Sequence, residues 1–300
     1  MPEGILRLPL FRWPASRRSP VSPDFQPVSS ATAVVAAAQF AGTADVAANL
    51  AAMEQLAADA ARRGAALVVF PEASMYDFSA SAGEIAAAAR RDGARFEAGV
   101  RAIAERHRIA MVAGMYGDGG GPLARNTLVA FDAGGRPLGR YEKLHLYDAF
   151  HYRESDKNAR APLLDDFAEL TTFDLAGFRF GLLNCYDIRF PEMARLLVDR
   201  GADILLVSSG WVAGPLKEMH WETLLKARAI ENTAYVVASC QPAPMSVGLS
   251  MVVDPCGIAT ATAAGGAGLA LAELSAERII AVREILPCLA HRRYQVVQKR

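Results

Sequence analysis

Hydrophobic residues fall into short runs that alternate with longer amphipathic stretches from Ala31 onward. Short apolar runs rich in β-branched residues are typical of buried strands, and apolar residues recurring at helical spacing are typical of helices. On this basis the first half predicts strands at residues 33–40, 67–70, 109–116, 127–131 and 139–143, with helices at 45–63 and 95–108. Gly64 ends the first helix and Pro71 ends the second strand.

The second half repeats the alternation loosely. It predicts a hairpin at 171–175 and 178–184, helices at 192–200, 217–232 and 276–286, strands at 204–208 and 235–239, a meander at 251–254, 258–262 and 269–274, and a tail from 290. Apolar strands interleaved with helices favour an α/β protein whose sheets are covered by helices. No linker interrupts the pattern, so we expect a single domain over residues 31–300, tail included.

The first thirty residues differ in composition from the rest of the chain. They contain six prolines and four arginines, and proline at this density blocks regular structure. The apolar stretch at residues 8–11 is too short for a signal-peptide core. We expect residues 1–30 to be a flexible leader or an incorrectly assigned start. A transit peptide is a weaker alternative.

Composition narrows the class of protein. Hydrophobic residues make up 52% of the chain and charged residues 21%, which excludes a disordered or fibrous chain. The 32 basic and 32 acidic residues cancel, so nothing favours nucleic acid or an anionic membrane as a partner. No apolar run reaches the length of a membrane helix. The four scattered cysteines argue against disulfides, so we expect a cytoplasmic location.

Three reactive side chains follow predicted strands. Glu72, Lys143 and Cys185 come directly after the runs at 67–71, 139–142 and 180–184. In α/β proteins ligands bind outside the carboxyl ends of strands, so the three could converge. A cysteine nucleophile needs a base, which a carboxylate can supply, and an ammonium can stabilise an oxyanion. Each residue also has a structural alternative. Glu72 could cap a helix or form an ion pair, Lys143 could be a surface lysine, and Cys185 could be a buried thiol.

A second hypothesis is that a histidine, and not a carboxylate, acts as the base for the cysteine. His145 and His220 are the candidate bases, and on a strand His145 would share a face with Lys143. A hydrogen-bonded structural role is favoured for His145. Asp187 and Arg189 are expected to form an ion pair or to anchor the loop. The cysteines and histidines show no metal-ligand spacing, so we expect no metal.

Together the motifs resemble the nitrilase superfamily of carbon–nitrogen hydrolases. The matching segments are VVFPE at 68–72, YEKLHL at 141–146, CYDIRFPE at 185–192, HW to RAIEN at 220–232, and SMVVDP with a later glycine at 250–257. The order Glu, Lys, Cys, with separations of 71 and 42 residues, also fits the family. Five segments in order outweigh the structural alternative for Cys185.

The resemblance implies a four-layer αββα sandwich with two internally similar halves. It implies a catalytic triad of Glu72, Lys143 and Cys185, with Glu154 as a second glutamate, and no cofactor. It also implies a homodimer or larger homo-oligomer with contacts through the helix at 192–200. The chain departs from the pattern at Asn184, where an apolar residue is usual before the cysteine, and lacks the usual Pro-Gly turn after Glu154.

The function implied is hydrolysis of a small amide through a cysteine thioester. The segment at 143–150 resembles omega-amidase and deaminated glutathione amidase relatives, which favours a carboxylate-bearing amide. Nitrile hydrolysis and acyl transfer are the alternatives, and a non-catalytic binding scaffold is disfavoured because no triad residue is lost. The Tyr186 backbone N–H is expected to stabilise the oxyanion beside Lys143.

Aromatic and basic residues near these motifs are the candidates for binding the substrate. Phe150, Tyr152, Trp211 and Trp221 are expected as apolar walls. A substrate carboxylate could meet Arg153, Arg189 or Lys217, and of these Arg is suited to a bidentate pairing. The sequence leaves the choice open.

Overall fold

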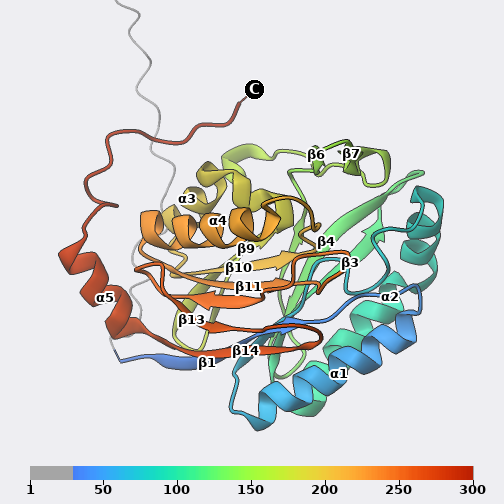
Figure 1. The fold of residues 1–300 in the computed structure, drawn as a ribbon, viewed down its shortest axis with the longest axis horizontal. Helices are drawn as coiled ribbons and strands as arrows, with labels where there is room; N and C mark the ends of the chain where they lie inside the picture. The colour runs from blue at the N-terminus through green and yellow to red at the C-terminus, as the bar shows by residue number, and fades with distance from the viewer. Residues whose placement is uncertain (1–29, 300) are drawn as a thin grey trace, which may run out of the picture.

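Two six-stranded sheets form the centre of the computed structural model, which describes residues 30–299 (Figure 1). The first sheet has the order β14 (Gly268–Ser275), β1 (Thr32–Gln39), β2 (Leu67–Val69), β3 (Ala110–Asp118), β4 (Ala124–Phe131) and β5 (Pro137–Glu142). The second has the order β13 (Ala259–Thr262), β12 (Met251–Val253), β11 (Tyr235–Cys240), β10 (Ile204–Ser209), β9 (Phe178–Asn184) and β8 (Thr172–Leu175).

Helices cover the outer face of each sheet. The pair α1 (Val46–Arg62) and α2 (Ala82–His107) packs on the first sheet, and the pair α3 (Pro191–Asp199) and α4 (Lys217–Asn232) packs on the second (Figure 1). The helix α5 (Ala276–Ile285) lies at one end of the sandwich. The four-layer αββα prediction is therefore confirmed. No helix within residues 30–299 is long and apolar enough to cross a membrane.

The two halves repeat one topology. In the first, β1, β2 and β3 are parallel and joined through α1 and α2, and β4 and β5 follow antiparallel. In the second, β9, β10 and β11 are parallel and joined through α3 and α4, and β12 and β13 follow antiparallel. The strands β14 and β8 occupy matching edges beside β1 and β9. The predicted internal similarity is thus confirmed, although the sequence shows no detectable repeat.

Alternation along the buried strands explains the layering. Side chains of a strand point to opposite faces in turn. In β1, Val35 and Ala37 belong to the core between the sheets, whereas Ala36 and Ala38 pack toward α1 and α2. Because both faces are covered, the strands read as continuous apolar runs rather than as alternating ones.

Two sequence expectations were wrong in extent or placement. The helix predicted at 95–108 begins at Ala82, where Ser81 and Glu84 form a capping box. Its first half is rich in alanine and contains Gly93, which weakens the amphipathic signal. The last strand of the predicted meander, β14, pairs with β1 in the opposite sheet instead of with β13. A local pattern cannot say which sheet a strand joins.

The ends of the chain have no regular element in the part that is described. The predicted leader lies outside the described residues except for residue 30. After α5, residues 286–299 contain no helix or strand (Figure 1). This segment still contacts the body of the protein, because Arg292 pairs with Asp199 at the end of α3 and Gln298 donates to the Leu164 carbonyl.

Candidate active site

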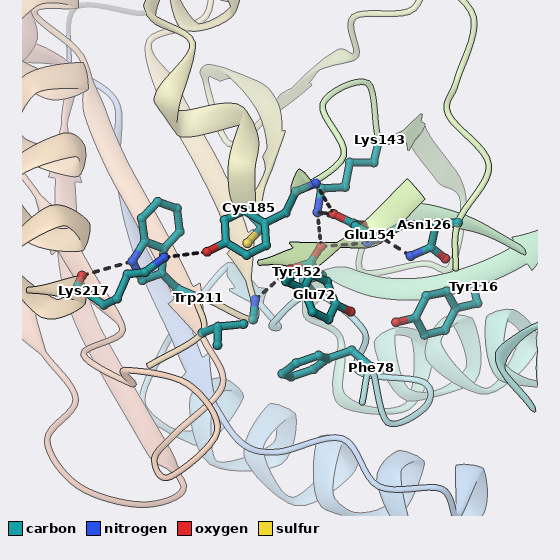
Figure 2. Close-up of a pocket in the computed structure, with 14 residues that line it drawn as sticks. Glu72, Phe78, Tyr116, Asn126, Lys143, Tyr152, Glu154, Cys185, Trp211 and Lys217 are labelled. Atoms are coloured by element: carbon teal, nitrogen blue, oxygen red, sulfur yellow. Dashed lines mark hydrogen bonds and ion pairs between the residues drawn. The ribbon is translucent and has the colours of Figure 1, made fainter. Parts of the chain in front are cut away.

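Four of the predicted residues meet in one pocket. Glu72, Lys143, Glu154 and Cys185 line a hollow of about 510 Å³, including the open space at its mouth (Figure 2). Each is buried, with 2 to 7% of the residue exposed. Glu72 follows β2, Lys143 follows β5 and Cys185 follows β9, so strand ends from both halves of the fold supply the site.

Glu72 is held by donors from three directions. Its Oε1 accepts from Lys143 Nζ at 2.6 Å and from Asn126 Nδ2 at 2.7 Å, and its Oε2 accepts from the Gly210 backbone N–H at 2.9 Å. Gly114 in β3 lies directly under this turn. A Cβ at that position would lie 2.6 Å from the Pro71 carbonyl oxygen, so only glycine allows β3 to pass so close to the turn.

Lys143 lies between two carboxylates. Besides Glu72, its Nζ donates to Glu154 Oε2 at 2.8 Å and Oε1 at 3.0 Å. Glu154 begins the short 3-10 helix η1 (Glu154–Asp156), and its Oε2 also accepts from the Tyr147 backbone N–H at 2.7 Å. Buried charges require such pairing because an uncompensated charge in a dry interior is very costly.

Cys185 is the first residue of the 3-10 helix η3 (Cys185–Arg189) and has a φ of 49°, in the left-handed region. A residue other than glycine adopts this conformation only where its surroundings enforce it. Asp187 provides the restraint: it accepts from the Asn184 backbone N–H at 2.9 Å and from Tyr141 Oη at 2.7 Å. Asp187 is therefore a loop anchor, and no ion pair joins it to Arg189 among the described residues.

The charges around the cysteine set the protonation states. Burial and the Glu72 charge raise the pKa of the Cys185 thiol well above its usual value, against the effect of Lys143. Burial alone would raise the pKa of Glu72, but Lys143 and the Gly210 N–H lower it overall. Burial alone would lower the pKa of Lys143, but Glu154 and Glu72 raise it well above its usual value. The resting site therefore holds a thiol, a carboxylate and an ammonium.

Asn126 is a central residue that the sequence analysis missed. From β4 its Nδ2 donates to both Glu72 and Glu154, the latter at 3.1 Å, and its Oδ1 accepts from Asn184 Nδ2 at 2.9 Å. Asn184, which departs from the family pattern, thereby ties the cysteine turn to the carboxylates. The polar segment Arg125–Thr127, directly before the apolar run at 128–131, is the signal that could have drawn attention to Asn126.

The predicted substrate-binding residues separate into two groups. Tyr152 and Trp211 line the pocket. Tyr186, Phe150 and Arg189 do not line it but contact residues that do: the Tyr186 ring packs edge-on against Tyr147 at 5.1 Å, and the Arg189 guanidinium lies 4.7 Å from the Trp211 ring. Phe150 is 62% exposed at the rim.

Further residues complete the lining without having been predicted as wall residues. They are Phe78, Tyr116, Asn126, Tyr147, Asn158, Gly210, Val212 and Lys217. Trp221, an expected wall, is fully buried under Trp211 and donates to the Leu249 carbonyl. Most of these lining positions depend on how loops from distant segments pack together, which a linear pattern does not encode.

The structure does not support the hypothesis that a histidine acts as the base for Cys185. His145 lies beyond the end of β5, so it does not share a strand face with Lys143; its Nδ1 lies 2.7 Å from Asp187 Oδ1 and its ring stacks on Phe190 at 3.7 Å. His220 contacts Arg189 at 3.4 Å. Neither histidine lines the pocket. Within residues 30–299 no group of three or more acidic, histidine or cysteine side chains is arranged to hold a metal ion.

Comparison with known proteins places the chain among amidases. The family model for carbon-nitrogen hydrolases matches residues 32–284. A deaminated glutathione amidase from Escherichia coli O157:H7 is 37% identical over 265 residues, covering 87% of this chain and 97% of the relative. The deaminated glutathione amidase of Homo sapiens is 32% identical over 316 residues, covering 96% and 90%.

Solved structures agree with the fold. The C. elegans NitFhit protein superposes with a TM-score of 0.79 at 29% identity, covering 88% of this chain and 66% of that longer chain. A mutant amidase of the nitrilase superfamily from Nesterenkonia sp. AN1 gives a TM-score of 0.73 at 26% identity, covering 88% and 98%. In that amidase the acetamide moiety of fluoroacetamide has added covalently to the active-site cysteine.

The nitrilase-type sandwich, the pocket and the amidase relatives define an enzyme that hydrolyses carbon–nitrogen bonds. The chain belongs to the carbon-nitrogen hydrolase family, as the sequence motifs predicted.

Gly114→Ala should displace the Glu72 turn, because the new Cβ would lie 2.7 Å from Glu72 Cα. We expect the free energy of unfolding to fall by about 1–3 kcal/mol. Misplacing a reactive group should also lower the amidase kcat/KM by about 10–100-fold. Urea denaturation and steady-state kinetics measure the two effects.

Gly83→Ala is the matched control, because no atom lies within 4 Å of a Cβ added there, in the first turn of α2. It should keep full activity and gain slightly in stability. Unchanged kcat/KM in Gly114→Ala would contradict the role given to this close packing.

Proposed function

We propose that the protein hydrolyses a small carboxylate-bearing amide to a carboxylate and ammonia through a thioester on Cys185. The observation that carries the proposal is the shared pocket in which Cys185 lies beside the Glu72–Lys143 ion pair. A nucleophile, a base and a fixed positive charge within contact of one another are the minimum set for cleaving an amide.

Glu72 acts as the general base in this mechanism. Because the thiol pKa is raised and the carboxylate pKa is lowered, little free thiolate forms before the substrate arrives. The proton therefore moves from Cys185 to Glu72 while the sulfur attacks the carbonyl carbon. The neutral thiol is also protected from unproductive reactions in the empty site.

The tetrahedral oxyanion requires donors that are already in place. An ammonium has three N–H groups. Glu72 accepts from one N–H of Lys143, and the two oxygens of Glu154 share a second N–H, so in the proposed mechanism the third is directed to the oxyanion. The Tyr186 backbone N–H lies in the first turn of η3, where N–H groups have no partner within the helix. Glu154 fixes the position of Lys143 and does not take part in proton transfer.

Collapse of the intermediate breaks the carbon–nitrogen bond. Glu72 returns its proton to the nitrogen, ammonia leaves, and the acyl group stays on the sulfur as a thioester. Water then attacks the thioester carbonyl, Glu72 takes a proton from the water, and the thiol is restored on release of the carboxylate product. A secondary amide would follow the same steps and release an amine.

The relatives support the substrate class. Deaminated glutathione, in the name of several of them, is a small molecule with amide bonds and carboxylates. The covalent adduct in the Nesterenkonia amidase supports a cysteine nucleophile in this fold. A homodimer with contacts through α3 and a cytoplasmic location stay predictions.

Cys185→Ala should abolish ammonia release, by more than about 1,000-fold, because the attacking atom is gone. The assay is ammonia release from a panel of amides, ω-amides and nitriles, with mass spectrometry of the trapped acyl adduct in the wild type. The thermal unfolding midpoint should stay close to that of the wild type.

Cys256→Ala removes an exposed thiol and should leave activity intact, which makes it the control. An adduct on Cys240, Cys256 or Cys288 would mean that Cys185 is not the nucleophile. Conversion of nitriles without amides would favour the nitrilase alternative.

Asn126→Ala should shift the pH dependence of kcat/KM. Removing its N–H from Glu72 Oε1 takes away a bond to the charged form, so the pKa of Glu72 rises. Activity needs the carboxylate, so the acid limb of the profile moves to higher pH. Asn158→Ala is the comparison, because Asn158 donates to Glu154 at 3.3 Å and not to Glu72. Equal shifts in both variants, or none in Asn126→Ala, would contradict the assignment of Glu72 as base.

A further inference from the structure

A buried cation without an acidic partner lines the same pocket. Lys217, at the start of α4, is only 5% exposed. Within residues 30–299 its ammonium forms no ion pair, and the one hydrogen bond it donates goes to Tyr147 Oη at 2.7 Å. Lys143, the other lysine of the pocket, has two carboxylates. A buried ammonium left in this state lacks the compensation that buried charges require.

Aromatic rings surround the Lys217 ammonium. Its Nζ lies 4.0 Å from the centre of the Phe150 ring, 4.9 Å from that of Tyr147 and 5.6 Å from that of Trp211. Ring faces attract a cation but do not neutralise it. The enclosure therefore restricts the position of the ammonium while leaving its charge available.

The position of Lys217 is unfavourable for the fold itself. It occupies the first turn of α4, where the helix dipole repels positive charge. The nearby Arg189, stacked on Trp211, adds to the repulsion, and burial followed by this charge lowers the pKa of Lys217. A bound anion would relieve each of these costs at once.

We propose that the Lys217 ammonium, together with the Tyr147 hydroxyl, binds the carboxylate of the substrate while Cys185 attacks its amide. The inference rests on the proposed amidase function and names the residues that select the substrate. Tyr147 accepts a hydrogen bond from Lys217, so its own O–H remains free to donate. Burial raises the pKa of the Tyr147 hydroxyl, so it keeps that proton.

Of the three cations that the sequence suggested for binding a carboxylate, only Lys217 lines the pocket. Arg153 is exposed and pairs with Asp156 outside the pocket. Arg189 lies against Trp211 but does not line the pocket. In Figure 2, Lys217 and Trp211 lie on one side of Cys185, and Glu154 and Asn126 lie on the other. A substrate can therefore extend from Cys185 toward Lys217, away from Glu154.

Matched substrate pairs test the proposal. Malonamate, succinamate and glutaramate are each compared with the amide in which a methyl replaces the carboxylate: propanamide, butanamide and pentanamide. The wild type should prefer the carboxylate in at least one pair. Lys217→Met should lower that preference, measured as the ratio of kcat/KM values, by at least about 30-fold and mainly through KM. Tyr147→Phe should lower it less.

The control is Lys226→Met, on the exposed face of the same helix, where Lys226 pairs with Glu222. It should leave the ratio unchanged. Thermal unfolding should show Lys217→Met to be at least as stable as the wild type, because the change removes a buried cation. Equal losses for both members of a pair would indicate a structural role and overturn the inference.

The outcomes also distinguish this inference from the proposed function. Hydrolysis of the neutral amides through a Cys185 adduct, with a ratio that does not depend on Lys217, would overturn the inference alone. Failure of the wild type to hydrolyse any amide of the panel would overturn both.

Discussion

The buried ion-pair cluster of Lys143 with Glu72 and Glu154 is the constraint on which the site depends. Its three charges sum to one negative charge in a dry interior, so each carboxylate must keep its hydrogen bonds. Loops that follow β2, β5 and β7 (Tyr152–Arg153) must therefore meet at one point. Burial, and after it the Glu72 charge, keep Cys185 in the thiol form, so in the proposed mechanism the thiol passes its proton on during attack.

The duplicated topology supplies the meeting point. Strands β2 and β10 hold the same place in the two halves, and Glu72 beyond the end of β2 accepts a hydrogen bond from Gly210 at the end of β10. Cys185 follows β9, also in the second half. The proposed base and the proposed nucleophile thus come from different sheets, and neither half contains a complete site. The packing of the two sheets sets the distances on which the chemistry depends.

Much of this arrangement could be predicted from the sequence, for a definite reason. Glu72 and Cys185 each follow an apolar run, and Lys143 follows a predicted strand of mixed composition, so a strand end carries the signal locally. Asn126 lacked such a signal because it lies within a strand, and β14 was misplaced because its partner strand β1 is more than 200 residues away. The predictions of the pocket walls were the least successful. Of the expected walls, Phe150 and Trp221 lie beside the pocket instead of lining it, since loop packing and not sequence proximity decides which side chain faces inward.

Several locally unfavourable features lie at the pocket. Three residues at the pocket have φ in the left-handed region. They are Ala73 beside Glu72, with φ 55°; Cys185 itself, with φ 49°; and Leu216 before Lys217, with φ 61°. Such conformations persist where the surrounding structure enforces them, and they concentrate at functional sites. A lysine at a helix N-terminus is a further departure of the same kind. These conformations cost free energy and do not help the chain to fold. They hold a thiol, a carboxylate and an ammonium around one hollow before any substrate arrives.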